Sequence, residues 1–245
     1  MEEVTIYRTL KTFLDKQARD NNLLGEKVSI HGKVLSAEEA IGKPQRQDFP
    51  LIKGKEKLLQ AEFRGAFGQA FTDSPASFEG TLRDFLEMPL ETNFQKAAFI
   101  AVLNAVMRYL GLVEGTIHCK DEEPNECAQK LVDYLRQRFD HPKIALVGFQ
   151  PALLEFCSRE FPVRAVDLNP ENIGKEKYGV LVEDAGLKTQ ELIEWCDLLL
   201  VTGSTLANGT IDHFLGLDKK VVFYGTTIAG AAKVLGLERF CGCAK

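Results

Sequence analysis

The sequence lacks any hydrophobic run long enough to cross a membrane. Its longest apolar stretches, such as Ala97–Val106 and Leu198–Val201, fall well short of the roughly 20 residues that a membrane helix needs. The first residues, Met1-Glu2-Glu3, are acidic and lead into an amphipathic stretch, which is not the pattern of a signal peptide. We therefore expect a cytoplasmic protein that has no membrane partner.

The chain also lacks an excess of positive charge. Lys and Arg number 30 against 35 Asp and Glu, which gives a formal net charge of −5. Because a general grip on nucleic acid needs a basic face that neutralises phosphates, we expect no nucleic-acid partner. The composition leaves a homo-oligomer open.

Histidine is scarce, and the cysteines follow no framework. The four histidines and six cysteines form neither His-x-x-x-His nor Cys-x-x-Cys, so the sequence predicts no standard zinc site. Without an export signal, the cysteines are expected to be reduced thiols. Cys241-Gly242-Cys243 can offer two thiolates to a soft metal, but the sequence does not place His118, Cys119 or Cys127 relative to this tail. The alternative is that all are ordinary helix and tail cysteines.

What is present is the composition of an ordinary globular protein. Hydrophobic residues make up 45% and charged residues 27% of the 245 positions, which suits one large domain or two modest ones. The composition changes near Asp140-His141-Pro142. We therefore predict an α/β protein with an N-terminal α+β domain over residues 1–140 and a Rossmann-like parallel α/β domain over residues 141–245.

The first half reads as a small antiparallel sheet packed by helices. The predicted elements are a helix at Val4–Arg19, strands at Val28–Ile30 (with a possible extension to Val34) and Leu59–Phe63, a further extended segment at Gly65–Thr72 that bends at its glycines, and helices at Ser77–Met88, Asn93–Leu110 and Asn125–Phe139. The middle one of the last three helices is apolar nearly all round, so we expect it to be buried on several sides.

The second half repeats a strand–loop–helix rhythm. Its strands are short continuous apolar runs, which are typical of strands buried on both faces. Strands are predicted at Lys143–Val147, Val163–Val166, Val180–Val182, Leu198–Val201 and Val221–Tyr224, and helices at Pro151–Glu160, at Thr189–Trp195, from Thr205 to about Leu215 and after Thr227. Strands that alternate with helices imply right-handed crossovers and a parallel sheet.

Four strand ends carry residues that suit ligand binding. In open parallel sheets, ligands sit outside the carboxyl ends of the strands. The sequence places Gly148, Asp167, Thr202–Thr205 and Gly225–Thr227 at such ends. The stretch Thr202–Thr210 combines a flexible backbone with hydroxyls and an amide, so it can hold a phosphate, a carboxylate or another anion near a helix start. The alternative is that Ser204 or Asn208 caps a helix.

Asp167 has two readings. It lies 19 residues beyond Gly148, where dinucleotide-binding folds place the acid that accepts hydrogen bonds from a ribose. It can equally be an N-cap or turn residue ahead of Asn169-Pro170. The loop Gly148-Phe149-Gln150-Pro151 has one glycine where the dinucleotide fingerprint has three, and Phe149 would crowd a pyrophosphate. Ordinary NAD use is therefore disfavoured, whereas a nucleotide or a methyl donor bound in another way stays open.

Two features of the first half can reach toward the second. Gly65–Thr72 can bring Thr72 close to the other domain, or it can be a bulged strand with a close packing contact. Asn104 is a polar residue in an otherwise apolar helix. A buried Asn without hydrogen-bond partners costs on the order of 1–3 kcal/mol, so Asn104 either pins a loop or reaches into the interdomain cleft.

Several of these motifs resemble one family. Val147–Pro151, Asp167–Pro170 and Cys196–Thr210 are similar to the putative heavy-metal chelation family, and the most specific piece is the Thr-Gly-Ser-Thr-Leu…Asn-Gly-Thr stretch. The helix around Asn104 and the Gly65–Thr72 strand resemble its N-terminal partner domain. The resemblance implies an N-terminal domain similar to the enolase N-terminal fold, a Rossmann-like C-terminal domain and a site between them. One departure is Gly225-Thr226-Thr227, where the family usually has a Gly-Pro-Ser/Thr-type turn.

These observations lead to one hypothesis and two alternatives. The hypothesis is a protein that binds a small anionic ligand, or a metal complex of one, in the interdomain cleft, and the resemblance implies a role in heavy-metal chelation. The alternatives are an enzyme that uses a nucleotide or S-adenosylmethionine, and a non-catalytic sensor or carrier. No catalytic residue can be named, and the cofactor is unknown, with a metal ion as one candidate. The candidate ligand-binding residues are Thr72, Asn104, Gly148, Asp167, Asn169, Thr202, Gly203, Ser204, Thr205, Asn208, Gly209, Thr210, Gly225 and Thr226.

Overall fold

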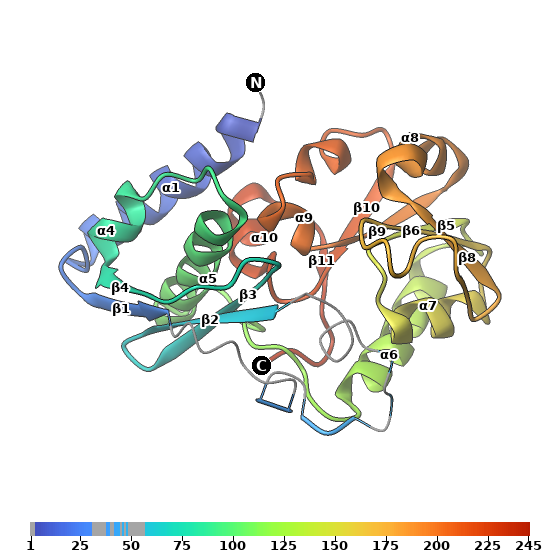
Figure 1. Ribbon diagram of the computed structural model, residues 1–245, viewed down its shortest axis with the longest axis horizontal. Coiled ribbons are helices and arrows are strands. Elements are labelled where there is room, and N and C mark those ends of the chain that lie inside the picture. Colours follow the sequence, from blue (N-terminus) through green and yellow to red (C-terminus); the bar gives the residue numbers. More distant parts are fainter. Residues whose placement is uncertain (1–2, 31–37, 40–41, 45, 47, 49–56) are drawn as a thin grey trace.

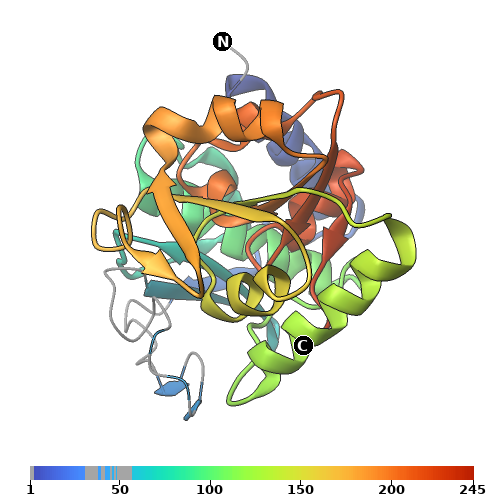
Figure 2. The same ribbon diagram turned by 90° about the vertical axis from the view of Figure 1, so that its right-hand side faces the viewer.

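The computed structural model describes residues 3–30, 38–39, 42–44, 46, 48 and 57–245. It contains two β-sheets surrounded by helices (Figures 1 and 2). The first sheet has four strands that are all antiparallel, and the second has seven strands that are mostly parallel. The mixed α/β architecture expected from the sequence is confirmed. The expected extension of the first strand to Val34 lies outside the described residues.

The antiparallel sheet comes from the first part of the chain. The elements are helix α1 (Glu3–Asp20), strands β1 (Lys27–Ile30), β2 (Lys57–Phe63), β3 (Ala66–Thr72) and β4 (Phe78–Thr81), and helices α4 (Leu82–Glu87) and α5 (Asn93–Tyr109), with the strands in the order β3-β2-β1-β4. Strands β2 and β3 form a hairpin whose two turn residues, Arg64 and Gly65, have positive φ angles of 49° and 80°. Positive φ at both positions is what a tight two-residue hairpin turn requires.

The helix predicted over Ser77–Met88 is wrong in its first part. Phe78–Thr81 pairs antiparallel with Lys27–Ile30, so strand β4 precedes the helix. Helix α4 begins only after Thr81, whose backbone N–H donates to the Asp84 carboxylate at 2.7 Å while its hydroxyl accepts from the Asp84 N–H at 3.4 Å. The helical spacing was correct for the second part alone, because pairing with β1 and this capping box set the boundary.

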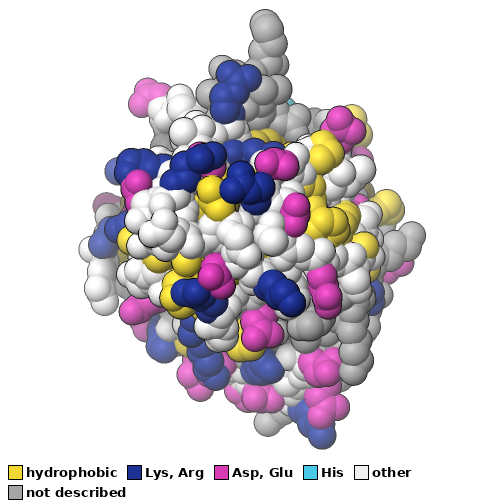
Figure 3. All heavy atoms as spheres, turned by 90° about the vertical axis from the view of Figure 1, so that its left-hand side faces the viewer, with side chains coloured by type: hydrophobic (Ala, Val, Ile, Leu, Met, Phe, Trp, Pro, Cys, Tyr) yellow, Lys and Arg dark blue, Asp and Glu magenta, His cyan; other side chains and the backbone are white. Residues whose placement is uncertain are grey.

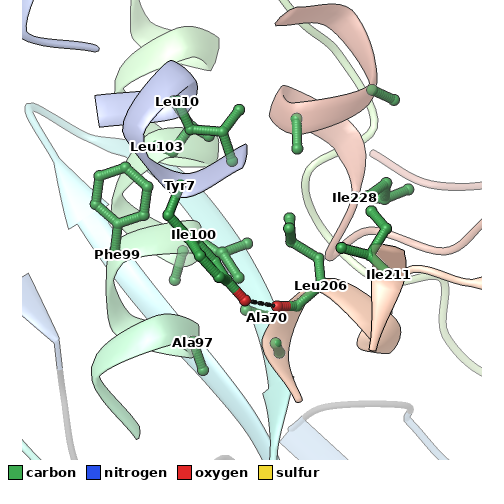
Figure 4. Packing of buried hydrophobic residues seen from close by; sticks show 14 of the residues in the cluster. Tyr7, Leu10, Ala70, Ala97, Phe99, Ile100, Leu103, Leu206, Ile211 and Ile228 are labelled. Atoms are coloured by element: carbon green, nitrogen blue, oxygen red, sulfur yellow. Dashed lines mark hydrogen bonds between the residues drawn. The ribbon is translucent and has the colours of Figure 1, made fainter. Parts of the chain in front are cut away.

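Helix α5 is buried nearly all round, as its apolar sequence predicted, and residues 97–107 all lie in the interior. Strand β3 packs directly against it at Gly68, where a Cβ atom would come within 2.3 Å of the Ala101 carbonyl oxygen and of the Ala105 nitrogen. Figure 4 shows residues of α1 and α5 facing Leu206 and Ile228 of the second half of the chain. The two halves therefore share one hydrophobic core.

The parallel sheet comes from the second part of the chain. The elements are α6 (Glu123–Arg138), β5 (Ile144–Val147), α7 (Pro151–Ser158), β6 (Val163–Asp167), β7 (Glu176–Lys177), β8 (Val180–Asp184), α8 (Ala185–Trp195), β9 (Leu198–Thr202), α9 (Ser204–Ala207), the 3-10 helix η1 (Ile211–Phe214), β10 (Lys220–Tyr224), α10 (Ala229–Leu235) and β11 (Arg239–Phe240). The strand order is β11-β10-β9-β5-β6-β8-β7, and only β7 is antiparallel to its neighbour. The short strand β11 was not predicted.

The helix predicted from Thr205 to about Leu215 is also wrong as a single element. Helix α9 ends at Ala207, and η1 begins at Ile211. Between them, the Asn208 side chain accepts hydrogen bonds from the Thr210 N–H (3.1 Å) and hydroxyl (2.7 Å), and Gly209 has a φ of 79°. These features form a local turn that competes with the helix, as Asn side chains do in helix interiors.

The two faces of the parallel sheet bury different cores. Along β5, Ile144 and Leu146 face the cluster that contains α6 and α7, whereas Ala145 and Val147 face the cluster shared with α5. This alternation is the two-residue period of a strand covered on both sides. Helices α6 and α7 lie on the face opposite α8 (Figure 2). The division of the chain at residue 140 stays a prediction.

On the face shown in Figure 3, basic and acidic side chains are interspersed, so neither positive nor negative charge dominates that face. Among the described helices, none combines the length and the apolar character that crossing a bilayer demands.

Candidate functional site

A cavity of about 500 Å³ opens where the carboxyl ends of the parallel strands meet. The chain runs outward from β5 through β6 to β8, then returns to the other side of β5 with β9 and continues to β10. Neighbouring loops therefore diverge between β5 and β9, and such a point is where open sheets bind ligands. Phe71 of β3 also lines the cavity, so the antiparallel sheet contributes to its wall.

Most of the predicted ligand-binding residues lie on this cavity. The ten that line it are Gly148, Asp167, Thr202, Gly203, Ser204, Thr205, Asn208, Thr210, Gly225 and Thr226. The four that do not line it are Thr72, Asn104, Asn169 and Gly209. The fold thus brings together the four strand ends singled out in the sequence, and whether they bind a ligand stays a proposal.

Asp167 serves the local structure of the loops. Its carboxylate accepts hydrogen bonds from the backbone N–H groups of Phe149 at 2.7 Å and Asn169 at 2.6 Å, and from the Asn172 side chain at 3.4 Å. These bonds join the loop after β5 to the loop after β6. The turn role weighed in the sequence is therefore present.

Gly148 is required by the close approach of three strand ends. Its φ is +87°, and a Cβ atom there would lie 2.6 Å from Thr202 Cγ2. The Tyr224 hydroxyl of β10 donates to the Gly148 carbonyl at 2.8 Å. Any larger residue would push the ends of β5 and β9 apart.

The Thr202–Thr210 loop uses much of its polarity internally. The Gly203 N–H donates to the Tyr224 carbonyl at 2.8 Å, the Ser204 N–H donates to the Thr202 hydroxyl at 3.3 Å, and the Thr205 hydroxyl donates to the Thr202 carbonyl at 2.8 Å. Gly203 is the N-cap of α9 and Asn208 is its C-cap, so of the two residues weighed as caps only Asn208 takes such a position. The polar groups that this loop offers the cavity are mainly side chains and not a row of backbone donors.

Asn104 positions the last turn of the site without lining the cavity. Its amide nitrogen lies within donating distance of the carbonyls of Gln69 (3.0 Å), Thr226 (3.2 Å) and Thr227 (3.2 Å), and its oxygen accepts from the Gly230 N–H at 2.7 Å. Asn104 is fully buried. Of its two predicted roles, pinning a loop is the one that the structure shows.

Thr226 is the polar residue that the fold leaves unsatisfied. It is 1% exposed, and its hydroxyl has no hydrogen-bond partner among the described residues. The neighbouring Thr227 hydroxyl, by contrast, accepts from the Phe71 N–H at 3.1 Å. A buried hydroxyl without a hydrogen-bond partner is costly, so this side chain destabilises the fold locally.

Sequence reasoning missed that His118, Cys119, Cys127 and Cys241 line this same cavity. The hydrogen bond between the two thiols lowers the pKa of Cys241 to about 6 and raises the pKa of Cys127. Burial lowers the pKa of His118, whose Nδ1 lies 2.6 Å from the Cys119 carbonyl oxygen. A sequence motif with fixed spacing does not predict this proximity, because Cys241 reaches the cavity only through the position of the C-terminal tail in the fold.

The rim of the cavity carries two exposed leucines. Leu168, directly after Asp167, is 53% exposed, and Leu187 near the start of α8 is 80% exposed. His213 of η1, which has no motif context in the sequence, lies on the same wall. No Lys or Arg side chain is found among the described residues that line the cavity. Nor do three or more His, Cys, Asp or Glu side chains form a metal-binding group in the described ranges.

Comparison with known proteins links the chain to one family. Residues 130–237 match the DUF364 family, whose description is "Putative heavy-metal chelation". A solved structure of a DUF364 protein of unknown function from Pyrococcus horikoshii is similar over 89% of this chain and 79% of that chain, with 16% sequence identity and a TM-score of 0.53. A second, from Desulfitobacterium hafniense, covers 73% of this chain and 72% of its own, with 12% identity and a TM-score of 0.49. No curated protein matches the chain.

The family resemblance drawn from the sequence is thus confirmed over residues 130–237. The likeness to the Pyrococcus protein supports a shared fold.

Proposed function

We propose, starting from the match of residues 130–237 to a family described by heavy-metal chelation, that this protein handles metal ions. It binds a small anionic ligand as a metal complex in the cavity at the carboxyl ends of β5, β6, β9 and β10. The cytoplasmic location, the absence of nucleic-acid and membrane partners and the possibility of a homo-oligomer stay predictions from the sequence.

One observation carries this choice of ligand. The cavity offers hydroxyls, an amide and thiols, yet no Lys or Arg among the described residues that line it. A bare multivalent anion would lose its hydration there without a compensating charge, which is unfavourable. A metal–anion complex brings its own cation, so its net charge is small, and its remaining oxygens can accept hydrogen bonds from the wall.

The hydroxyls that suit this role come from two loops. Thr202 and Ser204 lie on the cavity wall after β9, with their oxygens 3.3 Å apart. Thr226 brings an unpartnered hydroxyl from the loop after β10. The hydroxyls donate hydrogen bonds to the anion, and the metal ion offsets the negative charge of the anion. Neither component alone therefore makes the full set of interactions.

A thermal-shift experiment tests the proposal with citrate alone, Ni²⁺ alone and the two together. We expect the pair to raise the melting temperature more than the sum of its components. The double variant Thr202→Val, Ser204→Ala should lose most of this shift. Ser158→Ala, which removes a hydroxyl on α7 that donates to the Glu155 carbonyl at 3.1 Å outside the cavity, should keep it. An equal shift in both variants, or no shift with any complex of this type, contradicts the proposal.

The second candidate is an enzyme that uses a nucleotide or S-adenosylmethionine. The parallel strands β8-β6-β5-β9-β10 follow the order of doubly wound dinucleotide-binding folds, which supports a Rossmann-like assignment. The exposed Leu168 and Leu187 flank the place beside Asp167 where such folds hold a nucleoside. The flat faces of a nucleobase pack against apolar side chains of this kind.

S-adenosylmethionine and ATP in the same thermal-shift assay test this candidate. Leu187→Lys should abolish a nucleoside-dependent shift. Leu181→Lys is the matched control, because Leu181 is 54% exposed and does not line the cavity. A shift that survives Leu187→Lys, or one that both substitutions abolish equally, speaks against a nucleoside at this rim.

A further inference from the structure

Three cysteines that are far apart in the sequence meet at the cavity. Cys119 follows a segment that hydrogen-bonds to β3, Cys127 lies in α6, and Cys241 follows β11. Gly242, the neighbour of Cys241, lies against Lys130 of α6, whose Nζ donates to the Gly242 carbonyl at 3.4 Å, and Cys127 lies one helical turn before Lys130. The fold therefore brings Cys127 and Cys241 close together on the wall of a space that a small ion can enter.

Hydrogen bonds hold the C-terminal tail, which carries Cys241, in place. Ile117 and Lys245 exchange two backbone hydrogen bonds of 2.8 and 3.0 Å, and Arg108 donates to the Lys245 carbonyl at 2.6 Å. Figure 2 shows the C-terminus beside α6, and Lys245 Nζ lies 2.9 Å from Oε1 of Glu123, the first residue of that helix. The tail that carries Cys241 is thus fixed against the helix that carries Cys127.

Positive charge lies next to the pair. Lys130 Nζ is 3.4 Å from Cys243 Sγ and also donates to the Gly242 carbonyl at 3.4 Å. The Arg239 guanidinium donates to the Gly225 carbonyl at 3.0 Å and acts electrostatically on Cys241. Two thiolates around a monovalent cation leave one net negative charge, and nearby cations offset such a charge.

We infer that Cys127 and Cys241 bind one soft monovalent cation, of the Cu(I) class, as a two-thiolate site on the cavity wall. Soft thiolates select such ions, and these ions accept linear coordination by two sulfurs. As the ion binds, each sulfur that still carries a proton releases it to solvent, and each sulfur forms a bond to the cation without any electron transfer. The inference rests on the proposed function, because the ion enters through the same cavity.

This site differs from the pair that the sequence suggested. Cys241 and Cys243 are adjacent in the tail, but only Cys241 lines the cavity, and Cys243 lies against Lys130. The third thiol, Cys119, lies on the wall without completing a cage of three ligands in the described ranges. Metals that prefer four protein ligands, such as zinc in structural sites, do not fit this arrangement.

The test uses Ag⁺ as an air-stable probe with the reduced, full-length protein in chloride-free buffer. Native mass spectrometry should show one Ag⁺ per chain that persists against an excess of glutathione. Cys127→Ala and Cys241→Ala should each weaken retention by about 100-fold or more, because each leaves a single thiolate without a chelating partner. X-ray absorption at the silver edge should show two sulfur neighbours.

Two matched variants make the result decisive. Cys157→Ala removes a buried thiol of α7 that does not line the cavity, and Cys243→Ala removes the adjacent tail thiol. Both should retain Ag⁺ as the unaltered chain does. Loss of Ag⁺ in Cys243→Ala with retention in Cys127→Ala would overturn the inference in favour of the tail pair. Equal retention in all four variants would overturn it as well.

The same samples separate this inference from the proposed function. If Ag⁺ binding fails while the citrate–Ni²⁺ shift persists and depends on Thr202 and Ser204, the thiol site alone is wrong. If Ag⁺ binds through Cys127 and Cys241 while no metal complex shifts the melting temperature, the thiol site stands and the oxygen-lined part of the proposal fails.

Discussion

Two polar residues of the site, Asn104 and Thr226, are buried to the same degree but have opposite environments. Asn104 has every polar atom within hydrogen-bond distance of a backbone group, and so it ties α5 to β3 and to the turn after β10. The Thr226 hydroxyl, held in place by that turn, has no partner among the described residues. Asn104 therefore stabilises the fold, whereas the unpartnered hydroxyl of Thr226 costs free energy.

Thr226→Val is expected to stabilise the protein without ligand. Valine keeps the shape and removes a buried hydroxyl that makes no hydrogen bond, so the free energy of unfolding should rise by about 1 kcal/mol. Urea unfolding followed by circular dichroism measures this. Thr72→Val is the control, because the Thr72 hydroxyl accepts from the Ser74 N–H at 3.1 Å, and its loss should lower stability. Destabilisation by both substitutions would show that the Thr226 hydroxyl has a partner.

Among the helices and strands, capping hydrogen bonds fix helix boundaries that hydrophobic periodicity does not reveal. The Ser77–Met88 stretch has helical spacing, but the Thr81–Asp84 capping box starts α4 at Leu82 and leaves Phe78–Thr81 to pair with β1. The hydrogen bond from the Thr81 backbone N–H, with one from its hydroxyl, lowers the pKa of Asp84. The cap is therefore sensitive to pH.

Asp84→Asn should lower stability at pH 6 and matter much less at pH 2. Because the pKa of Asp84 is lower in the folded chain than in the unfolded one, its contribution is fully present above the unfolded value and is lost as the pH falls through the folded value. Urea midpoints at the two pH values check this. Gln95→Ala, which breaks the corresponding capping box of α5 at an uncharged side chain, is the control and should cost the same at both pH values. A difference between Asp84→Asn and the unaltered chain that stays constant with pH would contradict it.

The packing of β3 on α5 depends on one glycine. A Cβ atom at Gly68 would overlap the backbone of α5 at 2.3 Å, so Gly68→Ala must separate the strand from the helix. We expect a loss of stability of about 1–3 kcal/mol or more, as for overpacked cores. Gly25→Ala is the matched control, because a Cβ atom there has no neighbour within 4 Å. Equal melting temperatures for the two variants would show that β3 can shift freely.

At the scale of the whole molecule, the first and last parts of the chain are joined through the core. The Tyr7 hydroxyl of α1 donates to the Leu206 carbonyl of α9, across 199 positions of sequence (Figure 4). In the sequence, Leu206 lies between Thr205 and Asn208, which both line the cavity. The N-terminal helix therefore supports the site from behind.

Tyr7→Phe should reduce the free energy of unfolding by about 1 kcal/mol, the usual net contribution of a buried hydrogen bond. The dependence on urea concentration should stay unchanged, because the surface exposed on unfolding is the same. Tyr109→Phe removes an exposed hydroxyl that accepts from Arg64 at 2.8 Å and should cost less. A larger loss for Tyr109→Phe than for Tyr7→Phe would contradict this account of the core.

The elements that can be predicted from the sequence are those whose signals are local. The apolar runs of β5 and β9 and the all-round apolar surface of α5 predict buried strands and a buried helix, and these are confirmed because burial on both faces leaves a pattern readable within a few residues. The sequence also placed ten of fourteen candidate residues on one cavity, because parallel strands end at the same edge of a sheet.

The remaining features depend on contacts between distant parts of the folded chain. Strand β4 forms because it pairs with β1, and Asn104 hydrogen-bonds to backbone groups of β3 and of the turn after β10. The proximity of Cys127 to Cys241 likewise depends on residues that are distant in the sequence. A local pattern reports which residues prefer to be buried, but not which distant group will satisfy a hydrogen bond or touch a thiol. Those contacts are fixed when the two sheets pack together and the tail settles against α6.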